Sequence, residues 1–208
     1  MKLKTATVVA IGAAGVFGLV ITSAAQSPKK GTSVSSAQKG VDAENARHAL
    51  RMLEEGKRTF RYDTFGSEAF WGDTLQLHKA IAGEKNGGVG PGVSPKTALS
   101  VGLKVDADAL PAALKKQLAA GKVNLDDPAT TIALLKLNAV VGVTAFANPD
   151  GSVRSMGIQC AFCHSTVDNS FAPGIGKRLD GWANRDLNVG AIVSLAPNLK
   201  PFTDLLGL

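Results

Sequence analysis

The chain has 208 residues, of which 45% are hydrophobic and 19% charged, and its formal net charge is +6. A charge this modest does not favour nucleic acid as a partner, although a local basic patch could steer an acidic redox partner. Once the N-terminal segment described next is set aside, about 180 residues remain, which is enough for one domain with a core of its own.

The first residues predict a secretory signal peptide. Two lysines precede an apolar run over residues 6–21, and small residues follow it. Cleavage after Ala25 would leave residues 26–41 as a flexible tether rich in Ser, Lys and Gly. An uncleaved membrane anchor is the alternative, but the run is short for a span of about 20 apolar residues. Either way, we expect the folded part, residues 42–208, to lie outside the cytoplasm, in a bacterial periplasm.

Four helices are expected before the two cysteines. Each predicted start carries apolar residues at spacings of three and four, a capping Ser or Asp, or both. The first helix is expected to end near Gly56 or soon after it, and the glycines at 83 and 121 are expected to end the second and third. The predicted ranges are 42–56, 67–82, 108–120 and 127–137. Between the second and third, the glycine-rich residues 86–95 lack the Gly-Lys-Ser/Thr of a phosphate-binding loop and predict a surface or cofactor-covering loop.

A short β-hairpin is expected immediately before the cysteines. Apolar residues 140–147 and 153–158 flank the turn sequence Asn-Pro-Asp-Gly. The sequence shows no internal repeat and no interior linker, so the fold class expected is mainly α, as one domain with one small hairpin. The remaining expected elements are a loop at 172–176 and short helices at 186–195 and 201–208.

The pentapeptide Cys160-Ala161-Phe162-Cys163-His164 carries the clearest chemical signal. Two thiols three residues apart can reach both vinyl groups of a haem, and the adjoining imidazole can bind its iron. A zinc site normally has four ligands in two separated pairs, whereas these are the only cysteines in the sequence. A redox-active disulfide normally lies in a βαβ pattern, which is not evident here. The motif therefore predicts one haem c, tethered by Cys160 and Cys163, with His164 as an axial iron ligand.

The second axial ligand is less clear from the sequence. No Met or His follows His164, so the downstream methionine that is usual in small cytochromes c is absent from this sequence. His78 lies near the centre of the apolar face of the predicted second helix, as either a core histidine or the distal ligand. His48 and Met52, four residues apart and opposite an apolar stripe, are weaker candidates.

Three further residues could support a haem from around the motif. The carbonyl of Pro173 could accept a hydrogen bond from His164, and Arg178 and Arg185 could pair with the haem propionates. Each of the three could equally be an ordinary loop or surface residue.

With these residues identified, the chain resembles bacterial periplasmic c-type cytochromes, and more narrowly the first haem domain of di-haem cytochrome c peroxidase-like proteins. The likeness rests on the haem motif and on residues 55–64, which are similar to the G-x-x-x-F-x-x-D opening of that domain. Residues 160–176 also look like those of larger cytochromes that carry a second haem motif. The resemblance implies a cytochrome c-like helical haem domain with a long helical insertion. Peroxidase activity in that group needs two haems, and this sequence has one motif.

The function expected from the sequence is that of a periplasmic mono-haem electron carrier, which transforms no substrate. The alternatives are a peroxidase-like haem enzyme with an open distal site and a haem subunit of a larger oxidoreductase. The expected partner is a redox protein, such as another cytochrome or a second haem domain, and not nucleic acid. A membrane is involved only if the N-terminal segment is not cleaved.

Overall fold

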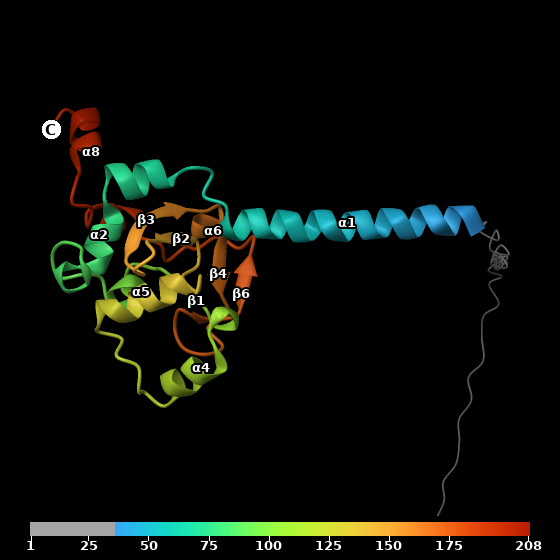
Figure 1. Ribbon diagram of the computed structural model, residues 1–208, viewed down its shortest axis with the longest axis horizontal. Helices are drawn as coiled ribbons and strands as arrows, with labels where there is room; N and C mark the ends of the chain where they lie inside the picture. Colours follow the sequence, from blue (N-terminus) through green and yellow to red (C-terminus); the bar gives the residue numbers. More distant parts are fainter. Residues whose placement is uncertain (1–35) are drawn as a thin grey trace, which may run out of the picture. The chain divides into compact units, whose positions relative to one another are not determined.

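The computed structural model describes residues 36–208, so the predicted signal peptide and residues 26–35 of the predicted tether lie outside the described residues. Of the described residues, about 49% are helical, and the strands form three two-stranded sheets (Figure 1). The fold is therefore mainly α, as predicted. No helix within residues 36–208 is both long enough and apolar enough to cross a membrane.

The first helix, α1 (Ser36–Tyr62), is longer than predicted at both ends. Its residues 36–45 belong to one compact unit and the remainder to a second unit, which comprises Ala46–Leu208. Gly56 does not end the helix, because one interior glycine costs only about 1 kcal/mol and charged residues that favour helices flank it on both sides. Residues 46–59 are all exposed, so the apolar stripe through Leu50 and Leu53 stays in contact with solvent.

The prediction of a continuous second helix at 67–82 was wrong. The segment divides into a π-helix, η1 (Ala69–Thr74), and α2 (Leu77–Ala82), with Gln76 in the left-handed region at φ 56°. Leu75 and Leu77 are only 0% and 1% exposed. Residues two apart face different sides of a continuous α-helix, so the break at Gln76 is what turns both leucines inward.

The ends of this region are also fixed by local contacts. Ser67 does not cap a helix; its hydroxyl donates to the carbonyl of Ile158 at 3.0 Å and accepts from the Ile158 amide at 2.9 Å. Gly83 ends α2 as predicted, with φ 71° and its N–H donating to Lys79. The short 3₁₀ turn η2 (Glu84–Asn86) follows.

The middle of the chain contains one helix that the sequence analysis missed. This helix, α3 (Pro95–Ser100), begins at the end of the predicted glycine-rich loop, and the Ser94 hydroxyl accepts from the Thr97 amide. Its signal was a Ser N-cap followed by Pro at the first helical position. The predicted third helix is shorter than expected, because Asp106 caps a separate 3₁₀ turn, η3 (Ala107–Ala109), before α4 (Ala112–Ala119). Asp127 caps α5 (Pro128–Lys136), as predicted.

The predicted hairpin is confirmed. Strands β2 (Val143–Ala147) and β3 (Val153–Ile158) pair antiparallel, with Val143 opposite Ile158. Two further pairs were not predicted, because strands of two or three residues are too short to show an alternating pattern. These are β1 (Val105–Asp106) parallel to β5 (Ile175–Gly176), and β4 (Ser165–Val167) antiparallel to β6 (Arg178–Asp180).

The pentapeptide at residues 160–164 leads from the hairpin into the second half of the fold. The one-turn helix α6 (Ala161–His164) lies between β3 and β4, and its Phe162 belongs to the main hydrophobic core. The same core receives Leu75, Leu135 and Met156 from η1/α2, α5 and the hairpin. The chain then continues through α7 (Val189–Val193) and α8 (Lys200–Leu206), close to the two short helices that were predicted.

Candidate haem-binding site

The pentapeptide presents its reactive and its apolar side chains on opposite sides of one turn. Cys160, Cys163 and His164 are exposed, and both cysteines are free thiols. Ala161 and Phe162 are 0% and 4% exposed. The His164 amide donates to the Cys160 carbonyl at 3.2 Å, which closes the turn. The two thiols and the imidazole therefore share one solvent-facing surface, while the intervening residues anchor the turn in the core.

A close backbone approach holds the turn against the hairpin. Gly142 has φ 84°, and a Cβ added there would lie 2.2 Å from Cα of Phe162. The Gln159 amide donates to the Gly142 carbonyl at 3.0 Å, just before the motif. Only glycine combines this left-handed conformation with such a small separation, so residue 142 sets the position of α6.

The carbonyl groups at the end of α6 are satisfied from a later loop. The Gly181 amide donates to the His164 carbonyl at 2.8 Å, and the Asn184 amide donates to the Cys163 carbonyl at 2.9 Å. A one-turn helix cannot pair its own last carbonyls, so these contacts replace the missing helical hydrogen bonds. They fix the backbone of both Cys163 and His164.

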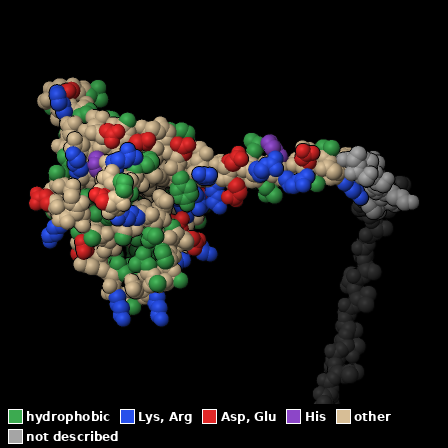
Figure 2. Space-filling view, in the orientation of Figure 1, with side chains coloured by type: hydrophobic (Ala, Val, Ile, Leu, Met, Phe, Trp, Pro, Cys, Tyr) green, Lys and Arg blue, Asp and Glu red, His purple; other side chains and the backbone are tan. Residues whose placement is uncertain are grey.

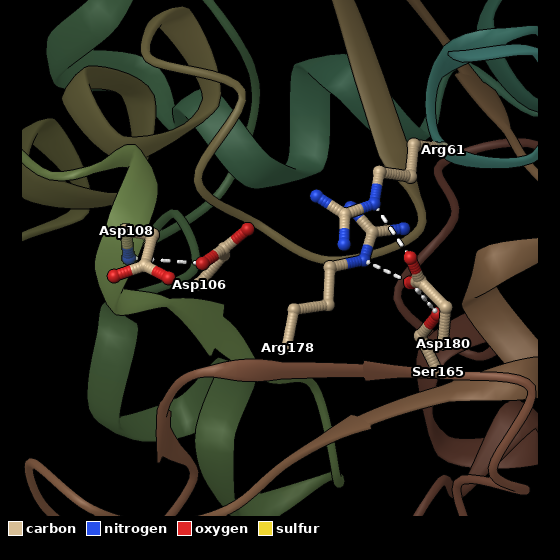
Figure 3. Close-up of polar contacts among 6 residues, drawn as sticks. All are labelled: Arg61, Asp106, Asp108, Ser165, Arg178 and Asp180. Atoms are coloured by element: carbon tan, nitrogen blue, oxygen red, sulfur yellow. Dashed lines mark hydrogen bonds and ion pairs between the residues drawn. The ribbon is translucent and has the colours of Figure 1, made fainter. Parts of the chain in front are cut away.

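A partly buried ionic network includes Ser165, the residue that follows this turn (Figure 3). Asp180 on β6 accepts hydrogen bonds from Ser165 at 2.7 Å, from Arg61 Nε at 2.6 Å and from Arg178 Nε at 2.8 Å. The Arg178 side chain is only 3% exposed. Since Ser165 follows His164 directly, the network ties the strand after the motif to the end of α1.

The charges in this network shift the protonation equilibrium of Asp180. Burial by itself would raise its pKa, but the hydrogen bonds from Ser165 and Arg61 and the positive charge of Arg178 outweigh burial and hold the pKa below its ordinary value. Asp106 adds a second carboxylate whose charge acts on both arginines, and its Oδ1 accepts from the Asp108 amide at 2.9 Å. The carboxylate of Asp180 is therefore ionised at neutral pH.

The three predicted supporting residues lie in different places. Arg185 lines a cavity of about 360 Å³ with Thr166 and the 67%-exposed Trp182, next to the loop that bonds Cys163. Arg178 is engaged with Asp180, and its Nη2 is buried without a hydrogen-bond partner. Pro173 is exposed and lines a different cavity that contains no residue of the motif. Arg185 is exposed and directly follows Asn184, whose amide donates to the Cys163 carbonyl.

His78 lies at the opposite end of the hairpin from the motif. It is 8% exposed and lines a cavity of about 250 Å³ with residues 152–154, where β3 begins. β3 runs over six residues, about 17 Å of extended chain, before it reaches the motif. The structure therefore does not bring His78 and His164 together.

The environment of His78 is that of a packed core residue. Burial lowers its pKa, the nearby charge of Lys79 lowers it further, and a hydrogen bond with the Gly72 backbone opposes these effects. Its Nδ1 is buried and has no hydrogen-bond partner. The imidazole is therefore neutral at pH 7.

The two weaker distal candidates lie on α1 and are both exposed. Along the helix axis, His48 and Met52 are about 20 Å and about 14 Å from Arg61, the residue of α1 that joins the network behind the motif. Met156 is 2% exposed and packs in the core. None of these side chains shares the exposed turn with Cys160, Cys163 and His164.

The two alternative uses of the cysteines can also be compared with the structure. Within residues 36–208, no group of three or more His, Cys, Asp or Glu is placed to hold a metal ion. The strands on either side of α6 belong to separate antiparallel sheets, so the motif does not lie in a βαβ unit. The surroundings thus differ from those of a thioredoxin-type disulfide.

The sequence analysis missed the residues that fix the turn from behind. Gly142, Ser165 and Asp180 carried no signal, because their roles depend on contacts with distant segments. Arg61 lies within the segment that carries the family resemblance.

Comparisons with protein-family models, with curated proteins and with solved structures found no match for this chain.

Proposed function

We propose that the chain binds one haem c covalently through Cys160 and Cys163, uses His164 as an axial iron ligand, and serves as an electron carrier in the periplasm. The observation that supports this most directly is the single exposed turn with two free thiols and an imidazole. Thioether attachment needs both thiols reduced and accessible, and iron ligation needs an imidazole that is not engaged in the core. All three requirements agree with the exposure of these side chains.

The residues around the turn would orient the group rather than react. A haem supplies an iron that alternates between two oxidation states, with a potential set by its ligands and burial. The backbone contacts from Gly181 and Asn184 would keep His164 and Cys163 in place during this change. Trp182 would offer an apolar surface, and Arg185 a positive charge for a carboxylate. In this proposal the fold is a cytochrome c-like haem domain with a long helical insertion between α1 and the hairpin.

A second candidate function is favoured by the position of His78. Because no described Met or His shares the exposed turn with His164, the second axial position would be open to a small molecule or to a ligand from a partner protein. An open position is typical of peroxidase-like haem enzymes and of haem subunits that dock onto another redox domain. The carrier function instead needs a sixth ligand, which a partner protein would supply.

The attachment is tested by producing the full chain in a host that exports it and matures c-type cytochromes. We expect a Soret band, and haem that stays with the polypeptide in acidified acetone. The Cys160→Ala/Cys163→Ala double variant should lose this covalent haem, whereas His48→Ala, which changes an exposed imidazole elsewhere, should retain it. Protein that is colourless, or that releases all its haem to the solvent, would contradict the proposal.

The choice between carrier and enzyme is tested on the same protein. A carrier with two protein ligands should be six-coordinate and low spin in both oxidation states. An enzyme with an open site should be high spin, should bind carbon monoxide when reduced, and should consume hydrogen peroxide in the presence of an electron donor. A low-spin spectrum with no carbon monoxide binding would exclude the enzyme.

A further inference from the structure

Away from the haem motif, the fold contains an apolar cavity of about 320 Å³ between α3, α4 and α5. Figure 2 shows hydrophobic side chains gathered around a hollow on this face of the molecule, in the region of α4 and α5. Leu114 and Leu118 of α4 line one side, and Ala129 and Ala133 of α5 line the other. The wall is therefore formed by aliphatic side chains from two separate helices.

The helix α4 covers the core only in part. Leu114 and Leu118 are partly buried, since they pack against the hydrophobic core and also line the cavity, and none of the eight residues of α4 is fully buried. A helix on the surface of a protein normally buries its apolar stripe against the core. Here part of that stripe borders the cavity instead, so an aliphatic ligand between α4 and α5 would cover it.

The charges around the cavity favour one kind of ligand. Lys122 is the one charged residue in its wall and is exposed, and the wall contains no acidic residue. Gln117 and Thr130 add uncharged polar groups. Two carboxylates that are close in sequence to the wall have other partners: Asp126 Oδ1 lies 3.3 Å from Lys96 Nζ, and Asp127 caps α5. The wall thus combines an aliphatic interior with one positive charge.

We propose that this cavity binds the aliphatic chain of a fatty-acid-like amphiphile, whose carboxylate pairs with Lys122. A volume of 320 Å³ is about that of ten water molecules in the liquid. Since a methylene group has nearly the size of a water molecule, a chain of about ten carbons fits. Apolar cavities of this kind bind apolar ligands in preference to water. This proposal does not depend on haem binding at the motif.

The test compares two soluble ligands that have the same chain and opposite charge, decanoate and decyltrimethylammonium, by isothermal titration calorimetry on the purified full chain. We expect decanoate to bind more tightly. Lys122→Glu should reverse this preference, with a change of about fivefold or more for decanoate, because it replaces attraction by repulsion. The control is Lys116→Glu, which makes the same change of charge at a residue of α4 that does not line the cavity. It should leave the preference for decanoate as it is.

The position of the chain is tested by filling the cavity. Ala133→Phe should weaken both ligands about tenfold or more, because the ring occupies the space of the chain. Ala113→Phe, an exposed position of α4 that does not line the cavity, should leave binding unchanged. Circular dichroism checks that each variant is folded.

Three results would overturn the proposal. The first is decanoate that does not bind at millimolar concentration, and the second is decanoate binding that Ala133→Phe leaves unchanged. The third concerns the oligomeric state, measured by analytical ultracentrifugation. A wild-type dimer that Ala133→Phe converts to a monomer would show that a second copy of the chain covers the cavity.

Discussion

The two histidines that sequence analysis selected as iron ligands lie in opposite kinds of surroundings. His164 is exposed on a turn whose carbonyl groups are fixed by the Gly181 and Asn184 amides. His78 is 8% exposed, contacts the Gly72 backbone, and has a pKa that burial lowers. The turn around His164 has a hydrogen-bonded backbone and exposed side chains, whereas the region around His78 is a packed interior. Of the two imidazoles, only that of His164 therefore combines a hydrogen-bonded main chain with a ring that an external group can reach.

The strongest test of this comparison replaces each histidine in the haem-loaded protein. If the proposed haem attachment holds, His164→Ala should abolish the wild-type visible spectrum, because the proposed proximal ligand is lost while both thioethers can remain. His78→Gln should leave the spectrum unchanged, since the structure does not place His78 at the motif. The measurement is the optical spectrum of the ferric and ferrous forms. If His78→Gln converts a low-spin spectrum to a high-spin one, His78 is the distal ligand and the comparison fails.

The rigidity of the motif turn is tested at Gly142. Gly142→Ala should lower the free energy of unfolding by about 3 kcal/mol or more, because the new Cβ would collide with the Phe162 backbone. Urea denaturation followed by circular dichroism measures the effect.

The matched control is Gly121→Ala. Gly121 also has a positive φ, 65°, but a Cβ there would meet nothing within 4 Å. We expect a loss of only about 1–2 kcal/mol, from the backbone conformation alone. Equal losses at the two positions would show that the close approach at Gly142 does not hold the turn.

The ionic network behind the motif should contribute less than this glycine contact. Asp180→Asn leaves the Arg178 guanidinium buried beside a neutral partner, and we expect a loss of about 2 kcal/mol. The same network predicts a loss of stability as the pH falls below the ordinary carboxyl value near 4 and through the lowered pKa of Asp180, because the unfolded chain binds this proton at a higher pH than the folded chain. Asp180→Asn should remove this part of the acid sensitivity.

Asp204→Asn provides the control for the network. Asp204 pairs with Lys200 at 2.7 Å, but both side chains are more than half exposed. Exposed pairs contribute about 0–1 kcal/mol, so this variant should stay close to the wild type. Urea denaturation at pH 7 and at pH 3 compares the two variants. An effect at Asp204 as large as that at Asp180 would remove the distinction between a partly buried and an exposed pair.

Local signals in the sequence predicted a large part of the fold. The Asp127-Pro128 helix start, the Gly83 helix end and the hairpin around residues 148–151 are each decided by a few neighbouring residues, and the structure has all three. The break at Gln76 was not predictable in this way. It depends on two leucines that must both reach a core formed by α5 and the hairpin.

For the candidate site, too, the sequence predicted the features that depend on neighbouring residues and not those that depend on distant ones. The spacing within residues 160–164 is local, and it selected three side chains that the structure exposes on one turn. The helical pattern also indicated correctly that His78 faces inward. It could not indicate which part of the fold His78 would face. Likewise, the pairing of Arg61 with Asp180 joins residues 119 positions apart, and no short-range pattern specifies such a contact.

The smallest expected effect concerns the protonation of His78. Because burial and the charge of Lys79 lower its pKa in the folded state, the unfolded chain takes up a proton at a higher pH than the folded chain. Stability should therefore fall as the pH drops from about 7 to about 5, through the ordinary histidine range near 6.5. His78→Gln should remove this part of the pH dependence, whereas His48→Gln, which changes an exposed imidazole, should retain it. Urea midpoints measured at pH 5, 6 and 7 test this prediction. A wild-type midpoint that rises on acidification would mean that the imidazole of His78 gains a negative partner in the core. Burial would then not be the cause of the difference between His78 and His164.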